Sequence, residues 1–455
     1  MRFSRNPRAT VRVAGVLAGS LGLCLSASGP ALGNGAFPDS LQILLPADRP
    51  DEIALATNFG VIMSDDGGRT WSWVCEGDLG DPLYAAYLYQ LGPAPTNRIV
   101  AVTPDNIVSS VDNACTWQKA AGAIEMAMPS DVFPDPVDPQ RIFAIASPFG
   151  GISTPTSVYE SRDGGRTMNK VLFQAPITGG LTGVEISRSS PRTLYVASYA
   201  TMTVNNVTTF QPKMSHSTDD GATWTTVDLD PSVGATSAKI IAVDPENSQR
   251  VFLRILGAVE RLGITDDGGK TVRTAVEIKG TMGGFVRLPS GVIIVGGSMP
   301  ANVGEVAQGA AYRSVDGGAT FTRWDNPPRV RGLAQRAGHI YVAGDNFVDG
   351  FALAEISEDG KTVKPLMKFE DVRAIKECVR AQCVNDCMRR AQLKLWPETV
   401  CGAGIDAGAG GAGGSGGTTP PRKTGCGCRT AGTAADGITW MLLLGALVVF
   451  RRSRG

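Results

Sequence analysis

Seven aspartates recur along the chain at near-regular spacing, and carboxylates in a repeated pattern could bind a cation, transfer a proton or hydrogen-bond a turn. Each stands in a phrase of the form Ser/Thr-x-Asp-x-Gly-x-Thr, followed by an aromatic or apolar residue, as in Ser64 to Trp71. The phrase lacks the Asp-x-Asp-x-Asp-Gly spacing of a calcium-binding EF-hand loop, so we predict no metal site. Its Ser and Asp side chains suit hydrogen bonds to nearby backbone N–H groups, and Gly supplies a positive φ. We therefore predict a hairpin tip at each copy, called an acidic turn below, with aspartates Asp66, Asp112, Asp163, Asp219, Asp267, Asp316 and Asp359.

The remaining side chains that could do acid–base chemistry show no such pattern. His216 and His339 are the only histidines, and we expect both to be structural or exposed, because no Ser-His-Asp signature surrounds them. Two carboxylates could flank a glycosidic bond, but no spacing selects a pair. We predict no catalytic residues and no cofactor. The carboxylates that remain open as such a pair are Glu76, Asp78, Asp81, Glu160 and Asp345.

The acidic turns are spaced like the units of a repeat protein. Successive aspartates are separated by 46, 51, 56, 48, 49 and 43 residues, and such periods indicate a repeat architecture. A short apolar run precedes each turn and reads as a strand between turn residues. Four short strands per unit match a propeller blade, so we predict an all-β, seven-bladed β-propeller of four-stranded antiparallel blades over residues 34–370. A β-helix, which would have a shorter and stricter period, is the alternative. The units stay in phase throughout, so the way the ring closes is not visible.

The phrase resembles the Asp-box, or bacterial neuraminidase repeat, of sialidase, sortilin and photosystem II assembly factor propellers. Ala114 replaces the box glycine in the second copy, and the seventh copy is one residue shorter. The resemblance implies that a sialidase or glucan hydrolase must be considered. The Phe-Arg-Ile-Pro segment of sialidases has no counterpart, since Arg141-Ile142 follows Gln140 and sits in a repeat position. The Gly-Thr-Asp-x-Gly segment of xyloglucanases is matched by residues 56–60, where Asn58 replaces the acid and cannot act as a general base.

The loops between the second and third strands of each blade should lie on the face opposite the acidic turns. Several carry aromatic and amide side chains among Ser and Thr, which suits a protein or glycan partner. Ordinary loop insertions, which propellers tolerate, are the alternative explanation. The candidate binding rim comprises Phe149, Tyr199, Asn206, Phe210, Asp345 and Asn346.

Cysteine usage indicates an oxidising compartment, because eight cysteines remain when Cys24 is removed with a predicted signal peptide at residues 1–33. Residues 371–401 read as a Cys-rich helical segment stapled by two disulfides with three possible pairings, a zinc site being the rival. Parity would also pair Cys75 with Cys115. Those two are predicted at opposite faces, however, beyond the roughly 7 Å Cα limit for a disulfide, so both outcomes stay open. The four cysteines of the helical segment are Cys378, Cys383, Cys387 and Cys401.

The C-terminal end reads as a tether and an anchor. Residues 402–425 form a Gly/Ala/Pro-rich linker, and residues 426–455 hold Cys426, Cys428, an apolar run and a terminal Arg cluster. This order resembles the C-terminal sorting signal of myxobacterial surface proteins, which implies processing and lipid modification near the cysteines, Cys426 first. A plain tail anchor is the alternative, although 13 helical residues reach only about 20 Å of a roughly 30 Å bilayer core.

The charge balance is even, with 43 basic and 43 acidic residues, and gives no sign of a nucleic-acid partner. These features predict an exported protein held at the cell surface or outer membrane by its C-terminal tail. We expect a non-catalytic propeller that binds a surface glycan or protein. A divergent glycoside hydrolase of the sialidase or xyloglucanase type and an envelope assembly factor are the alternatives.

Overall fold

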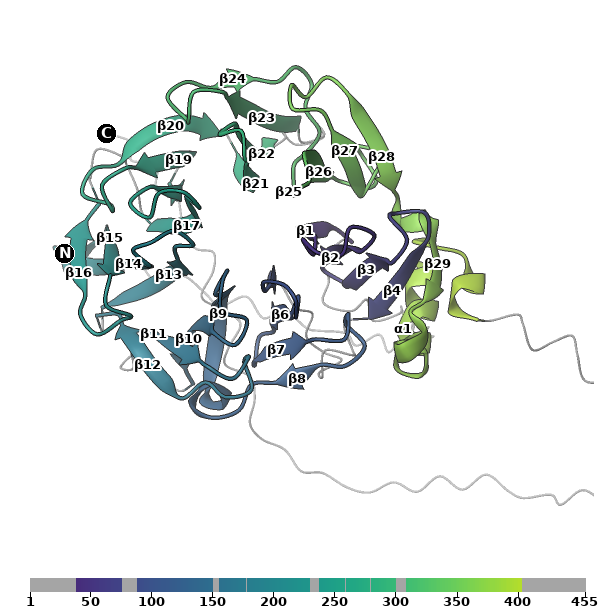
Figure 1. Cartoon of the computed structure of the whole chain (residues 1–455), viewed down its shortest axis with the longest axis horizontal. Helices are drawn as coiled ribbons and strands as arrows, with labels where there is room; N and C mark the ends of the chain where they lie inside the picture. Colours follow the sequence, from purple (N-terminus) through teal and green to yellow (C-terminus); the bar gives the residue numbers. More distant parts are fainter. Residues whose placement is uncertain are drawn as a thin grey trace, which may run out of the picture. The chain divides into compact units, whose positions relative to one another are not determined.

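The computed structural model describes residues 38–75, 88–149, 155–176, 178–229, 237–257, 259–278, 280–299 and 308–402. Within these ranges the strands form seven sheets around a common axis, each built on four antiparallel strands taken in chain order, and one sheet has an additional fifth strand (Figure 1). The prediction of a seven-bladed, four-stranded propeller is confirmed. Each repeat supplies one blade, so the repeat period is the blade period.

The strands run from the axis to the rim in chain order. The first strands are β1 (Ser40–Leu44), β5 (Leu88–Leu91), β9 (Ala127–Pro134), β13 (Gly179–Ile186), β17 (Ser237–Val243), β21 (Thr281–Arg287) and β25 (Gly332–Arg336). The second strands are β2 (Ile53–Thr57), β6 (Ile99–Val102), β10 (Ile142–Pro148), β14 (Leu194–Val204), β18 (Val251–Leu256), β22 (Ile293–Met299) and β26 (His339–Ala343). The third strands are β3 (Gly60–Ser64), β7 (Ile107–Ser110), β11 (Ser157–Ser161), β15 (Val207–Ser217), β19 (Glu260–Thr265), β23 (Gln308–Ser314) and β27 (Leu353–Ile356). The fourth strands are β4 (Trp71–Cys75), β8 (Gln118–Lys119), β12 (Lys170–Gln174), β16 (Thr225–Asp228), β20 (Arg273–Ile278), β24 (Thr322–Arg323) and β28 (Val363–Met367).

The second strands are the apolar runs seen in the sequence, and they are buried on both faces because blades stack on either side of them. All of β2 and β6 is buried, for example. The cores lie between neighbouring blades, as where Phe143 and Ile145 of blade 3 pack with Val184 and Leu194 of blade 4. Continuous apolar runs are expected of strands covered on both sides.

A fifth strand at blade 1 closes the ring. After β28 of blade 7 and the 3-10 turn η4 (Phe369–Asp371), strand β29 (Val372–Ile375) pairs in parallel with β4, Val372 opposite Trp71 and Ile375 opposite Trp73. The chain then forms η5 (Glu377–Val379), helix α1 (Arg380–Gln392) and η6 (Glu398–Cys401) against the outside of blade 1 (Figure 1). Residues 371–401 are therefore part of the ring closure.

The disulfides fasten this closing segment, but not in the predicted pairing. Cys75 bonds Cys383 and Cys115 bonds Cys378, with Cα separations of 5.4 and 5.5 Å, whereas Cys387 bonds Cys401. Of the two bonds expected within the helical segment only Cys387–Cys401 lies there; Cys378 and Cys383 bond the propeller instead, and Cys75 does not pair with Cys115. The reason is that the segment runs along the outside of blade 1, so one part reaches the end of β4 and another the acidic turn of blade 2.

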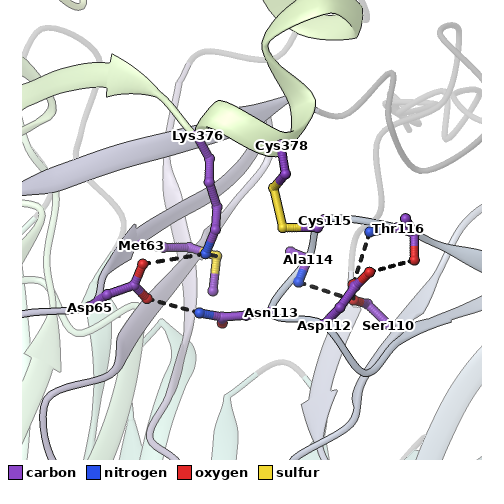
Figure 2. The surroundings of a disulfide bond; sticks show 10 residues. All are labelled: Met63, Asp65, Ser110, Asp112, Asn113, Ala114, Cys115, Thr116, Lys376 and Cys378. Atoms are coloured by element: carbon purple, nitrogen blue, oxygen red, sulfur yellow. Dashed lines mark hydrogen bonds and ion pairs between the residues drawn. A yellow bond between two sulfur atoms is a disulfide. The ribbon is translucent and has the colours of Figure 1, made fainter.

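Figure 2 shows the second of these bonds, which joins the acidic turn of blade 2 to the closing segment. Lys376, just before Cys378, lies 3.5 Å from the carboxylate of Asp65 in the first acidic turn. The Asn113 amide of the second turn donates to the other oxygen of Asp65 at 2.8 Å (Figure 2). The closing segment thus ties together the turns of blades 1 and 2.

Four aromatic side chains fill the space beneath the closing segment. Phe369 meets Phe59 edge-on with ring centroids 5.1 Å apart, and Trp396 lies 5.0 Å from Trp73. All four are almost fully buried. The closure therefore has an apolar core as well as covalent bonds.

The predicted signal peptide and the sorting segment with Cys426 and Cys428 lie outside the described residues, as do Glu76, Asp78 and Asp81. Within the part of the chain that the structure describes, no helix combines the length and the apolar character needed to cross a bilayer.

Candidate functional site

The acidic turns are hydrogen-bonded within themselves. In the first, the Ser64 hydroxyl donates to Asp66 at 2.8 Å and accepts from the Gly68 N–H, while Asp66 accepts from both the backbone and the hydroxyl of Thr70, at 2.9 and 2.7 Å. The next five turns repeat this pattern. The shorter seventh keeps the bond from Ser357 to Asp359. The aspartates use their oxygens inside their own turns.

Hydrogen bonding also sets the charge state of these aspartates. Bonds from the side chain and backbone of Thr223, then from Ser217, lower the pKa of Asp219 to about 2. The same kinds of bonds hold the pKa of Asp66 and of Asp316 well below the usual range. An acid that stays ionised and fully bonded is a poor proton donor.

The turns share a face with the loops that join first and second strands. The Gly67 N–H donates to the Asp51 carbonyl, and Gly164 and Gly268 donate in the same way to Gln140 and Gln249. The second turn departs from the pattern, because Asn113 and Ala114 adopt the two positive φ values that pairs of glycines take in four of the other turns, while Asp220 and Gly221 take them in the fourth turn.

Glu160, one of the candidate catalytic carboxylates, is committed to a buried ion-pair network. Its oxygens lie 2.7 Å from Arg141 and 2.7 Å from Lys170, and 2.9 Å from Arg162. Its side chain is fully buried. Glu160 therefore serves the packing of blade 3.

Asn58 and the histidines also have structural surroundings. The Asn58 side-chain oxygen accepts from the Asp39 N–H at 3.0 Å, which fixes the chain entering β1. His339 is exposed and paired with Glu355, and burial, followed by the charge of Lys270, lowers the pKa of His216 beside Tyr195.

A channel of about 400 Å³ runs along the axis. The first strands of all seven blades line it, with apolar side chains such as Phe133 and Phe285. Four charged side chains also reach it: Asp131, Glu185, Lys239 and Arg254. The sequence analysis did not single out any of these four.

The polar side chains of the channel join neighbouring blades. At four of the first strands, a side chain from the preceding blade accepts a hydrogen bond from an N–H of the free inner edge. Asp131 of blade 3 accepts from Val184 of blade 4 at 3.3 Å, and Glu185 accepts from Val243 of blade 5 at 3.0 Å. Gln42 of blade 1 likewise accepts from the Tyr89 N–H of blade 2, and Glu260, on β19 of blade 5, accepts from the Met282 N–H of blade 6. In the sequence, the signal that could have indicated these hydrogen bonds between blades was an isolated polar residue within an otherwise apolar first strand.

Burial, and then the nearby charge of Asp131, raise the pKa of Glu185 to about 8. Asp131, whose pKa burial also raises, pairs with Lys239 at 3.3 Å. At neutral pH the channel thus holds a Glu that carries its proton beside a paired Asp and Lys.

The structure divides the predicted binding rim into two groups. Phe149 is exposed just after β10. The rings of Tyr199 and Phe210 meet at an angle of 60° with centroids 5.7 Å apart on the hairpin of β14 and β15, which turns at Asn205 and Asn206. These four predicted residues lie on the face opposite the acidic turns.

The two rim candidates of blade 7 are structural instead. Asn346 is buried, accepts from the Phe369 N–H at 2.9 Å and donates to Glu370, so it does not belong to an exposed rim. Asp345 caps the Phe347 N–H and lies 3.5 Å from Arg331. Both hold the loop before η4.

Further exposed apolar side chains surround the first group and were not predicted. Met126 and Met128 stand beside Phe149 on blade 3, since the Phe149 N–H donates to the Met126 carbonyl. On the hairpin of blade 4, Met202 and Val207 are 63% and 62% exposed, and Val204 is exposed opposite Val207. We call these five residues with Phe149 and Phe210 the apolar arc.

Among the described residues, no group of three or more His, Cys, Asp or Glu side chains is placed to hold a metal ion.

Comparisons with known proteins return propellers. No family model and no curated protein matches the chain. Among solved structures, YCF48 bound to a D1 peptide is 14% identical with a TM-score of 0.45, and the match covers 69% of this chain and 93% of that one. YCF48 from Cyanidioschyzon merolae is 16% identical, with a TM-score of 0.45 and coverages of 67% and 92%. The GH74 xyloglucanase from Xanthomonas campestris is 13% identical, with a TM-score of 0.40 and coverages of 72% and 58%. Such distant likenesses transfer no function to this chain.

Proposed function

We propose that this protein is an exported, surface-anchored propeller that catalyses nothing and binds a protein partner on the face opposite the acidic turns. The supporting observation is the apolar arc of blades 3 and 4. Its members come from two neighbouring blades, whose first strands are joined by the bond from Val184 to Asp131. Exposed apolar side chains gathered on one face mark interaction sites more often than singly scattered ones. The signal peptide and the C-terminal anchor predicted from the sequence support export and surface anchoring.

The residues of the apolar arc lie at the same end of blades 3 and 4, opposite the acidic turns, and can therefore form one docking face. Strand β10 starts near the acidic turns and ends at Pro148, just before Phe149, and β14 runs in the same sense to the hairpin tip. Met, Phe and Val side chains suit a protein better than a glycan, whose hydroxyls need polar partners. A glycan partner is an outcome of the test below.

The test measures binding by the full-length protein to arrays of envelope proteins and surface polysaccharides from the producing organism. The variant Phe149→Lys/Val207→Lys places two charges in the arc. The control Val111→Lys/Val315→Lys places them at two equally exposed valines of the acidic turns. We expect the first variant alone to lose binding to a protein, about ten-fold or more. Equal binding by both variants, or binding of polysaccharide only, would contradict a protein-binding arc.

A glycoside hydrolase is the second candidate, and one observation favours it. Asp131 and Glu185 are near enough in the channel for one to raise the pKa of the other, as in acid–base pairs of glycosidases. Their bonds to Val184 and Val243 provide a structural reason for the same placement. Hydrolysis of a β-glucan by the wild type that is lost in Glu185→Gln would establish the enzyme and remove the non-catalytic proposal.

A further inference from the structure

We propose that the outer edge of β15 accepts an extended segment of the partner as an added β-strand, an inference that rests on the proposed protein-binding function. The site is the tip of the hairpin of blade 4, from Val207 to Gln211. The added strand would lie beside β15, beyond the point where β16 ends.

The hairpin is longer than the sheet that supports it. Strands β14 and β15 pair over eleven residues each, from Leu194 opposite Ser217 to Val204 opposite Val207. Strand β13 pairs with β14 only as far as Ala200, and β16 pairs with β15 only as far as Lys213. Among the described residues, no strand pairs with the outer edge of β15, the edge away from β14, between Val207 and Gln211, and residues 207–210 are exposed. The two-residue turn, with positive φ at Asn205 and Asn206, is of the type that favours a regular hairpin.

The register shows which backbone groups point outward. Val204 and Val207 flank a two-residue turn and bond each other, so in an antiparallel ladder the next pair, Thr203 and Thr208, directs its N–H and C=O groups away from the hairpin. The alternation continues to Phe210 and Pro212. Two bonds agree with it, because the Pro212 carbonyl accepts from Leu229, and Thr201 donates to Thr178 on the opposite edge. Thr208 and Phe210 therefore offer outward backbone donors and acceptors.

The edge lacks the features that protect exposed strands. Natural edges carry charges, prolines or bulges that block pairing. No charged residue occurs among residues 193–212, and Pro212 stands only where β16 begins to cover β15. The pairing of β15 with β14 shows no bulge. An uncharged, β-branched edge of this kind is open to strand addition.

The absence of charge over this stretch also selects the occupant. A charged side chain placed beside Phe210 and Val207 would lose hydration with no counter-charge from the hairpin. The matching occupant is therefore an extended segment of uncharged Val-, Thr- or Ile-like residues. A second copy of this chain fits less well, since an edge of about five residues buries far less than the roughly 1,200 Å² of a stable interface.

The test uses the full-length protein and a fluorescein-labelled peptide of alternating Thr and Val with a Lys at each end. Fluorescence anisotropy measures its binding. A second peptide carries N-methyl groups on alternate residues, which removes its backbone donors on one edge. We expect the first peptide to bind and the second to bind about ten-fold or more weakly, as lost backbone hydrogen bonds require. Equal binding of both peptides would overturn strand addition.

A matched pair of variants locates the edge. Thr208→Pro removes an outward N–H of β15, and Thr203→Pro removes the equivalent outward N–H of β14. Both lose the same 2.9 Å side-chain bond between Thr203 and Thr208, so only the edge differs. Thr208→Pro should weaken peptide binding about ten-fold, and Thr203→Pro should leave it unchanged. Equal effects of the two variants would overturn the assignment to β15.

Two further outcomes separate this inference from the proposed function. If the Lys variants of the arc lose the protein partner while Thr208→Pro retains it, the partner docks on side chains alone and strand addition is refuted. If the protein binds vesicles of phosphatidylcholine and phosphatidylglycerol through Val207 and ignores the peptide, the hairpin is a lipid-inserting arm and both proposals fail.

Discussion

Removing the Cys75–Cys383 bond tests how the ring is held closed. The double variant Cys75→Ala/Cys383→Ala deletes the link between the end of β4 and helix α1 without leaving a free thiol in that buried site. A disulfide stabilises mainly by restricting the unfolded chain, and the effect grows with the length of the loop it closes. The bond spans 308 residues, and Cys115–Cys378 spans 263 residues of the same stretch.

Because the two bonds overlap, each closes only a short loop while the other is present. With Cys115–Cys378 intact, the loop runs from Cys75 to Cys115 and back from Cys378 to Cys383, about 45 residues, which is worth about 4 kcal/mol. When the second bond is also removed, the full loop is released at about 5 to 6 kcal/mol. We expect the four-cysteine variant to lose about 10 kcal/mol, most of the stability of a typical domain.

Urea unfolding measures these losses of stability. The signal is the fluorescence of Trp73 and Trp396, which lie in the aromatic core beneath the closing segment. Cys387→Ala/Cys401→Ala is the control, because its 14-residue loop is independent of the other two and is worth about 3 kcal/mol. The reasoning is refuted if the four-cysteine variant loses no more than about 4 kcal/mol, the cost of a single bond. The pairing of β29 and the aromatic core would then close the ring without covalent help.

Three other predictions concern a turn glycine, a channel acid and a turn acid. Gly318→Ala should lower the free energy of unfolding in urea by about 2 to 4 kcal/mol, because φ at this position is +90° and a new Cβ would stand 2.5 Å from Ile264. Gly291→Ala, where φ is +86° and the surrounding space is open, should lower it by about 1 kcal/mol through backbone strain alone. Equal losses in the two variants would contradict this difference. The pKa of Glu185 is about 8 in the folded state, above its unfolded value, so its contribution to stability is complete below about pH 4.5 and is lost as pH rises to about 8. Glu185→Gln should therefore be more stable than the wild type at pH 8 but not at pH 5. A stability difference that is the same at both pH values would refute this prediction. The contribution of Asp219 to stability depends on pH in the opposite way. Its folded pKa of about 2 stabilises the folded state above about pH 4, and this stabilisation is lost as pH falls towards 2. The urea midpoint of Asp219→Asn should therefore fall less steeply over this pH range than that of the wild type, and parallel curves would exclude the effect.

The blades were predictable from the sequence because their determinants are local. An acidic turn needs only a Ser, an Asp, a positive-φ residue and a Thr within eight positions, and an apolar run is buried wherever two blades stack. The closure was not predictable because its determinants are distant. Nothing near Cys75 indicates a partner 308 residues away, and counting cysteines does not distinguish Cys383 from Cys115.

The site was predicted less well for the same reason. Phe149 and Phe210 were placed on the correct face, since the strand order fixes where each loop emerges. Asn346 was misjudged because its partner, the Phe369 N–H, comes from the closing segment, whose position the sequence did not reveal. The channel residues Asp131 and Glu185 were missed because their roles depend on which backbone groups of the next blade lie opposite.

The polar features that first suggested chemistry each have a structural task in the folded chain. The turn aspartates bond their own turns, Glu160 neutralises Arg141 and Lys170, and Glu185 holds blade 5 against blade 4. The hairpin of β14 and β15 is different, because its outer residues support no other part of the described structure and are exposed to water on both faces. Ordering a long apolar ribbon in water has no benefit for the fold, since fixing each residue costs about 1 kcal/mol or more of conformational entropy. A segment that supports no other part of the described structure and exposes Met202, Val204, Val207 and Phe210 is therefore the one we assign to a partner.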